Sequence, residues 1–335
     1  MNTKDIDLIN VLLIIISLAL AFNVPFGLFI FSYVLLGPLH YLTEINWLRE
    51  KSYFVKNKQW IWILVGFGLL ISLPFFFNAK EFTGEKPAGF IVDFSQFLQG
   101  YSDEILLVSL LFAVGLIHFK NRYHLLLFFV ASIVIAIPLL YYLPMFAIAV
   151  LFFLPTVVHV YCFTLLFMLY GTMQSRNKAG VVAIVLLILA PVIIAMSHIE
   201  PSEYFTMRDY TKTSYIDSGF GAVNLKAVAF LGGTGEFNIF SQIAIKVQIF
   251  LAFAYTYHYL NWFSKTSVIG WNKNLSRSKS KTILFIWLAS VALYLYNFKV
   301  GFIVLSSLSL MHVFLEFPLN VTSIKGILLK LKPSR

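Results

Sequence analysis

Two histidines of this 335-residue chain each precede a glutamate by four residues, in stretches that are otherwise apolar. The pairs are His40 with Glu44 and His312 with Glu316. Because an α-helix turns once in about 3.6 residues, the two members of each pair project from one face of a helix. An imidazole and a carboxylate are costly to bury in lipid unless a partner group, a water-filled cavity or a metal ion compensates them. The two pairs therefore mark a candidate functional site.

Three histidines are expected at nearly the same depth in the bilayer. With a helical rise of about 1.5 Å per residue, His40 and His258 each lie roughly 10 Å inside the end of a predicted membrane helix, and His312 lies about 12 Å inside. His159 is expected deeper, at about 18 Å. If these helices pack together, the three histidines of equal depth form one layer with the two glutamates.

Imidazole and carboxylate groups are ligands that iron, zinc and manganese accept in proteins, so the donor types leave these three metals open. The single cysteine, Cys162, excludes a thiolate cluster and an internal disulfide framework. The donor set could hold one metal with an open position, or two metals bridged by a carboxylate. The predicted ligands are His40, His258, His312 and His159, with Glu44 and Glu316 as ligands or proton acceptors.

Each of these residues also has a purely structural interpretation. A single histidine in a membrane helix more often hydrogen-bonds a neighbouring helix than binds a metal, and a carboxylate near a helix end can simply be hydrated. The repetition of the His–Glu spacing and the shared depth of the histidines favour the metal site.

The composition requires a membrane protein. Apolar residues make up 59% of the chain and charged residues 12%, whereas charged residues are about a quarter of a soluble domain. We predict an all-α bundle of about ten transmembrane helices in a single membrane domain, residues 1–335. The predicted spans are 7–22, 25–47, 59–77, 104–118, 123–140, 144–171, 180–197, 240–264, 281–297 and 300–319.

The distribution of basic residues predicts the orientation. Most of the 25 lysine and arginine residues fall at the termini and in alternate loops, which the positive-inside rule places in the cytoplasm. The net charge of +10 therefore indicates cytoplasmic loops rather than a nucleic-acid partner. Residues 1–21 could be a cleaved signal peptide, but Asp5 and Asp7 counter that interpretation, and we expect a retained first span.

Two longer segments, 78–103 and 198–239, are expected on the non-cytoplasmic side. The first combines acidic residues with Phe90, Phe94 and Phe97, which predicts an interfacial amphipathic helix. The second contains the run Gly232-Gly233-Thr234-Gly235, which lacks the lysine of a phosphate-binding loop. We interpret this second segment as a flexible or re-entrant loop.

The segment Gly37-Pro38-Leu39-His40, followed by Glu44, is similar to the GxxH-xxx-Asp segment of the bacterial Brp/Blh β-carotene dioxygenases. A histidine cluster at the cytoplasmic edge of a bundle also resembles membrane desaturases and hydroxylases. The resemblance implies histidine-bound iron, dioxygen as co-substrate and a long isoprenoid substrate. It extends only from Gly37 to Glu44, a glutamate replaces the family's aspartate, and the HxxxH and HxxHH boxes of desaturases are absent. Only His40 is carried over from it.

The sequence thus predicts a membrane-embedded, metal-dependent oxidoreductase that acts on a lipid or isoprenoid, most simply in a bacterial inner membrane. No soluble redox domain is evident, so an external electron donor is expected, with membrane lipids as further partners. One alternative is a proton- or ion-coupled transporter in which the buried histidines and glutamates form a relay. Another is a non-catalytic assembly or export subunit, in which these side chains only join helices.

Overall fold

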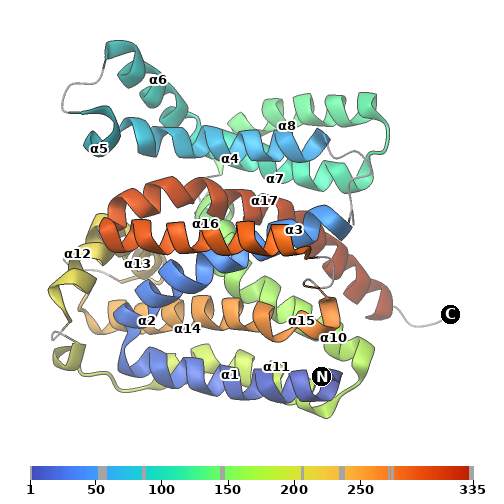
Figure 1. Ribbon diagram of the computed structural model, residues 1–335, viewed down its shortest axis with the longest axis vertical. Helices are drawn as coiled ribbons and strands as arrows, with labels where there is room; N and C mark the ends of the chain where they lie inside the picture. The colour runs from blue at the N-terminus through green and yellow to red at the C-terminus, as the bar shows by residue number, and fades with distance from the viewer. Residues whose placement is uncertain are drawn as a thin grey trace. The chain divides into compact units, whose positions relative to one another are not determined.

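The fold is known from a computed structural model that describes residues 2–51, 59–84, 88–143, 148–204, 207–233, 238–270, 272 and 275–331 (Figure 1). Helices dominate these residues, and no strand occurs among them, which confirms the predicted all-α class. Seven helices in this part of the chain are long and apolar enough to cross a membrane. They are Thr3–Asn23, Pro25–Arg49, Arg122–Tyr142, Phe152–Ser175, Lys178–Met196, Arg277–Tyr296 and Phe298–Leu331. The chain is therefore a multi-pass integral membrane protein.

The chain divides into two compact units. Unit 1 consists of Met1–His40 and Val160–Phe302, and unit 2 consists of Tyr41–His159 and Ile303–Arg335. The expected single membrane domain stays a prediction.

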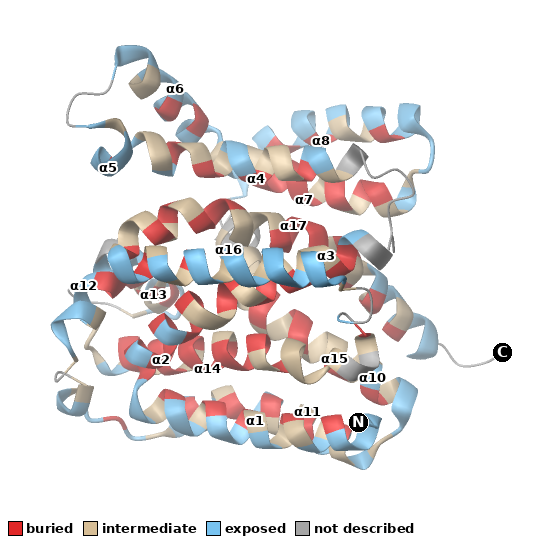
Figure 2. Ribbon diagram, viewed as in Figure 1, coloured by how far each residue is buried: buried red, intermediate tan, exposed pale blue. Residues whose placement is uncertain are grey.

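Unit 1 is built around helix α14. The helices of this unit are α1 (Thr3–Asn23), α2 (Pro25–Phe31), η1 (Ser32–Leu36), α10 (Thr164–Ser175), α11 (Lys178–Met196), η3 (Pro201–Tyr204), α12 (Asp209–Asp217), α13 (Phe220–Phe230), α14 (Gln242–Ser264), α15 (Thr266–Ile269) and α16 (Arg277–Tyr296). α14 is buried along most of its length because α1, α2, α11 and α13 pack against it (Figure 2). Its first turn is capped by Ser241, whose hydroxyl accepts a hydrogen bond from the backbone N–H of Ala244 at 3.2 Å.

Unit 2 contains the remaining helices. They are α3 (Gly37–Lys51) from Tyr41 onward, α4 (Gln59–Phe77), α5 (Lys80–Thr83), α6 (Gly89–Gly100), α7 (Ser102–His118), α8 (Arg122–Tyr142), η2 (Ile148–Phe163) up to His159, and α17 (Phe298–Leu331) from Ile303 onward. α7 and α8 lie side by side, and α4 packs against α6 and α7 (Figure 1). α6 and α7 meet at a bend of 55°.

The two segments predicted as non-cytoplasmic loops are largely helical where the structure describes them. Residues 78–103 include α5 and the predicted amphipathic helix, which is α6, with Phe90, Phe94 and Phe97 exposed. The described residues of 198–239 include η3, α12 and α13, so these parts are helical, and the re-entrant arrangement stays a prediction. Gly219 joins these two helices with φ of 79°, a conformation that glycine adopts without steric cost. Residues 234–237 of the glycine run lie outside the described residues, as do Pro144 and the start of the predicted span 144–171.

The last helix does not end where the sequence suggested. The span 300–319 was predicted to stop beside Pro318, whereas α17 continues through this proline to Leu331. A proline fixes φ at a helical value, so it can remain in a helix at the loss of one backbone hydrogen bond. The apolar residues beyond it bury one side of the added turns, including Ile327.

Two π-helical segments precede or contain histidines of interest. η1 ends four residues before His40, and η2 contains His159 and Pro155. π-helical turns are rare in proteins and often occur at functional sites.

Candidate metal centre

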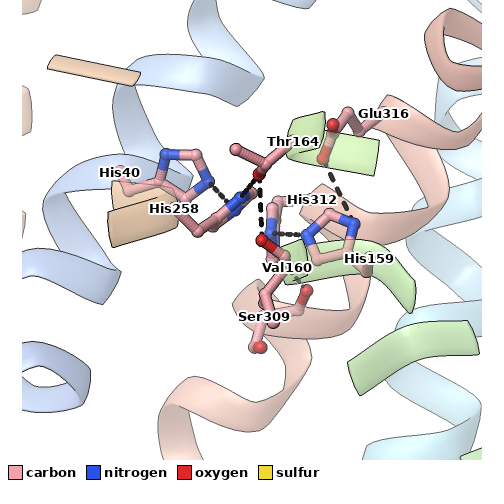
Figure 3. Close-up of polar contacts among 8 residues, drawn as sticks. All are labelled: His40, His159, Val160, Thr164, His258, Ser309, His312 and Glu316. Atoms are coloured by element: carbon pink, nitrogen blue, oxygen red, sulfur yellow. Dashed lines mark hydrogen bonds and ion pairs between the residues drawn. The ribbon is translucent and has the colours of Figure 1, made fainter. Parts of the chain in front are cut away.

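Unit 2 holds a buried group of two histidines and one glutamate. Each of His159, His312 and Glu316 offers one ligand atom, and these atoms all lie within 4.8 Å of one another. All three side chains are at most 2% exposed. His312 and Glu316 are one turn apart on α17, as their spacing predicted, while His159 comes from η2 (Figure 3). A buried group of this composition could hold a metal ion.

The two histidines of this group meet at their Nε2 atoms. Nε2 of His159 lies 2.9 Å from Nε2 of His312. Nδ1 of His159 lies 3.3 Å from a carboxylate oxygen of Glu316. On the other side, Nδ1 of His312 hydrogen-bonds the backbone carbonyl of Ser309. The four groups form a continuous polar chain from a carboxylate to a carbonyl (Figure 3).

This chain determines which nitrogen of His312 carries hydrogen. A carbonyl oxygen can only accept a hydrogen bond, so Nδ1 of His312 is the donor. In a neutral imidazole, Nε2 then presents its lone pair, and that lone pair faces Nε2 of His159. Histidines that bind metals in proteins usually donate from the opposite ring nitrogen in the same way.

Unit 2 also buries a second carboxylate, that of Glu44, which is 2% exposed. Glu44 lies close enough to Glu316 for the two charges to repel each other. It does not belong to the group of atoms within 4.8 Å described above. Two buried carboxylates that repel each other both stay ionised only if a cation compensates them; otherwise one of them holds a proton.

Unit 1 holds a second histidine pair with similar geometry. Nε2 of His40 lies 3.2 Å from Nε2 of His258, and the rings are nearly perpendicular, with centroids 4.8 Å apart. Nδ1 of His258 lies 2.8 Å from the hydroxyl of Thr164 (Figure 3). That hydroxyl donates its own hydrogen to the carbonyl of Val160 at 2.9 Å. Nδ1 of His258 must therefore be the donor to Thr164, which leaves Nε2 with its lone pair toward His40.

The distances between the histidines fit either a shared proton or a metal ion. With metal–nitrogen bonds of about 2.05 Å, nitrogens 2.9 Å apart subtend about 90°, and nitrogens 3.2 Å apart subtend about 103°. These angles lie between those of octahedral and tetrahedral coordination. A hydrogen bond between two neutral imidazoles has the same length.

Aromatic side chains surround both pairs. In unit 2 the ring of Tyr41 stacks on His312 with centroids 4.2 Å apart. In unit 1 the rings of Tyr259 and Trp262 lie 5.2 and 5.6 Å from His40. Such packing fixes the imidazole orientation and excludes bulk water from it.

All six residues predicted for the site are buried. Unit 1 brings His40 and His258 together, and unit 2 brings His159, His312 and Glu316 together. The layer predicted from His40, His258 and His312 has members in both units and stays a prediction. Nε2 of His159 reaches Nε2 of His312 although His159 was expected deeper.

Sequence reasoning missed the groups that orient the histidines. Thr164 gave a weak signal, because a threonine in an apolar helix usually bonds the carbonyl four residues earlier, as it does here. The carbonyl of Ser309 gave no signal, since any residue type supplies a carbonyl. No protein-family model, curated protein or solved structure matches this chain.

Proposed function

We propose that this chain is a membrane-embedded, metal-dependent oxidoreductase that uses iron and acts on a lipid or isoprenoid substrate. The observation that carries this proposal is the donor set of unit 2, His159, His312 and Glu316. Two histidines and one carboxylate, with further positions open, are typical of non-haem iron(II) enzymes that use dioxygen. Iron bound there would supply the activation of dioxygen, and the apolar surroundings suit a hydrophobic substrate.

The protein's own residues would prepare this site. Ser309 holds His312 in the tautomer that offers Nε2, and Glu316 faces Nδ1 of His159. We assign Glu44 as a proton acceptor, because it is a second buried carboxylate near Glu316. His40 and His258 are further proposed ligands, since their Nε2 atoms are as close as two ligands of one ion. The metal-to-protein ratio will show whether one ion or two is bound.

We further propose ten spans with both termini in the cytoplasm of a bacterial cell, in its inner membrane. α14, the bent pair of α6 and α7, and α4 with its apolar stretch Ile61–Phe77 would add three spans to the seven candidates. The concentration of basic residues in alternate loops supports this orientation. A fluorescent-protein fusion at the C-terminus should fluoresce, whereas an alkaline phosphatase fusion there should be inactive. An external electron donor and membrane lipids complete the proposed partners.

The direct test is metal analysis of purified protein. Protein produced with added iron should contain iron, and the variants His312→Ala and Glu316→Gln should lose it while remaining folded. His124→Ala is the matched control, because His124 is an exposed histidine of the same unit. Iron-loaded protein, supplied with dioxygen, a reductant and β-carotene or a membrane lipid extract, should yield oxidised products by mass spectrometry.

Folded wild-type protein that binds neither iron, zinc nor manganese would end this proposal. Metal bound equally by wild type and by His312→Ala would place the metal elsewhere. Oxidised products that form equally well without dioxygen would exclude dioxygen as the co-substrate.

One observation favours a second candidate, a proton-coupled transporter. The chain Glu316–His159–His312–Ser309 can pass a proton when the carboxyl is protonated and each imidazole donates to the next acceptor. Buried ionisable groups in membrane helices often form such relays. Proton flux into proteoliposomes that His312→Ala abolishes, in protein without metal, would support transport instead of redox chemistry.

A further inference from the structure

A line of buried polar side chains continues along α17 beyond the histidine–glutamate group. His312, Glu316 and Asn320 follow one another at intervals of four residues, and Ser323 comes three residues later. These intervals place all four side chains on one face of the helix. His312, Glu316 and Asn320 are each 2% exposed, and Ser323 is 6% exposed.

Neither end of the Asn320 amide makes a hydrogen bond of good geometry. Both Nδ2 and Oδ1 are buried, and neither reaches a protein donor or acceptor with hydrogen-bond geometry. The amide nevertheless lies near enough to the Glu316 carboxylate to interact with it electrostatically. Buried amides almost always have partners, and a gap between two polar groups is where a bridging water is expected.

Pro318 leaves a further acceptor in the same turns of α17, on another side of the helix. Because proline has no N–H, the carbonyl of Phe314, four residues earlier, lacks the helical donor that it would otherwise have. In membrane helices such carbonyls are satisfied by neighbouring side chains or by ordered water. On the face of the buried line, the Asn320 amide and the Ser323 hydroxyl offer three polar atoms within one turn of α17, enough for a small group of waters.

We propose that Asn320 and Ser323 hold ordered water and form a water route along α17 from Glu316 toward the C-terminal end of the helix. The route deepens the proposed function, because a site that consumes or releases protons or water needs such access. The proposed function does not require this route, since a metal ion could bind in a closed, dry pocket. Asn320 is a positioning residue for water in this proposal.

Cysteine accessibility tests the route without any knowledge of the substrate. The chain has a single cysteine, so Cys162→Ala provides a background free of thiols. In this background Asn320→Cys and Ser323→Cys report on the route, and Lys330→Cys is the exposed reference. Val313→Cys is the matched control, because Val313 is a buried residue of α17, 4% exposed, and close in size to cysteine. The probe is a small, charged, water-soluble methanethiosulfonate reagent on detergent-solubilised protein.

We expect Asn320→Cys and Ser323→Cys to react within about tenfold of the rate of Lys330→Cys. Val313→Cys should react at least about a hundredfold more slowly than Lys330→Cys, because the reagent reaches it only when the helices open transiently. Reaction of Asn320→Cys and Ser323→Cys at the slow rate of Val313→Cys would overturn the route.

Release of iron to a water-soluble chelator gives a second measurement. Asn320→Leu should slow this release at least about tenfold, whereas Asn320→Ser, which leaves room for water, should keep the wild-type rate. Equal rates for Asn320→Leu and wild type would also contradict the route. Labelling of the route in a protein that binds no metal would retain this inference and reject the proposed function. Metal binding by a protein whose Asn320→Cys and Ser323→Cys variants are not labelled would retain the proposed function and reject the water route.

Discussion

The hydroxyl of Thr164 lies 2.8 Å from Nδ1 of His258, and its hydrogen is already directed to the carbonyl of Val160. Thr164 therefore acts as an acceptor and fixes one tautomer of His258. In unit 2 the carbonyl of Ser309 does the same for His312. Each unit thus contains a histidine pair in which one member presents the lone pair of Nε2 to its neighbour. The same arrangement therefore occurs once in each unit.

Thr164→Val should weaken metal binding while preserving the shape of the side chain. Without the hydroxyl, Nδ1–H of His258 has lost its acceptor, so the tautomer with hydrogen on Nε2 gains population and blocks the lone pair. We expect metal affinity to fall about 10- to 100-fold, the usual effect of removing a group that orients a ligand. Competition with a chromophoric chelator measures this change.

Thr164→Ser is the control for that experiment. Serine keeps the hydroxyl and should retain most of the affinity. An unchanged affinity in Thr164→Val would show that His258 does not bind the metal. Equal losses in both variants would point to packing of the threonine methyl group instead of the hydrogen bond.

Local features of the site could be predicted from the sequence because they depend only on helical periodicity. The four-residue spacing of His312 and Glu316 placed both on one face of a helix, and α17 confirms this. The contact between His159 and His312 could not be predicted, because it joins residues 153 positions apart and depends on how η2 packs in unit 2. The π-helical turns of η2 also have no recognised sequence signal.

In the fold, too, local features could be predicted from the sequence, whereas features that depend on distant contacts could not. Apolar runs identified the seven candidate membrane helices, and the break between α1 and α2 occurs at Pro25 as predicted. Pro318, in contrast, does not end α17, because the apolar residues beyond it still bury one side of the helix. The segment 198–239 appeared loop-like, but Tyr215 and Phe220 pack against aromatic residues of α2. Burial by distant residues decided both outcomes.

Asn10→Leu should destabilise unit 1. The side-chain oxygen of Asn10 lies 2.7 Å from Nδ2 of Asn261, 3.1 Å from the hydroxyl of Tyr257 and 3.3 Å from that of Ser264. These contacts join α1 to α14, the helix that carries His258. Leucine would leave these buried groups without this acceptor, so we expect a loss of about 1–3 kcal/mol in the free energy of unfolding. Denaturant titration in detergent measures it.

Asn23→Leu is the matched control for Asn10→Leu. Both asparagines lie on α1 and donate to the carbonyl four residues earlier, Asn10 at 2.8 Å and Asn23 at 2.7 Å. The Asn23 side chain and its hydrogen bond are both exposed. Its substitution should change the free energy by less than about 0.5 kcal/mol. Similar losses in both variants would assign the effect to α1 alone rather than to its contact with α14.

Stability should rise with pH above about 8 because of Lys265. Burial lowers the pKa of Lys265 to about 8, and the nearby carboxylate of Asp7 partly offsets this effect. The unfolded chain keeps the ordinary lysine pKa of about 10.4, so between these values it binds a proton that the folded protein has released. The free energy of unfolding therefore increases with pH over this interval. Melting temperatures in detergent from pH 7 to 10.5 should show the rise.

Lys265→Met should remove this pH dependence, because methionine has no proton to lose. Lys246→Met is the control, since Lys246 lies on α14 but is exposed where it hydrogen-bonds the carbonyl of Ala195. It should leave the slope unchanged. A slope that persists in Lys265→Met would assign the titration to another group.

Gly301→Ala should destabilise the junction between α16 and α17. A Cβ at Gly301 would lie 2.9 Å from Cα of Tyr294 and 2.7 Å from Cδ1 of its ring, so the backbone of α16 would have to move. Such overpacking usually costs about 1–3 kcal/mol of unfolding free energy. Gly66→Ala in α4 is the matched control, because a Cβ there has no atom within 4 Å, and alanine at such a helical site stabilises by about 0.4–1 kcal/mol. Opposite shifts in melting temperature are therefore expected, and a gain in stability for Gly301→Ala would contradict the close approach of the two helices.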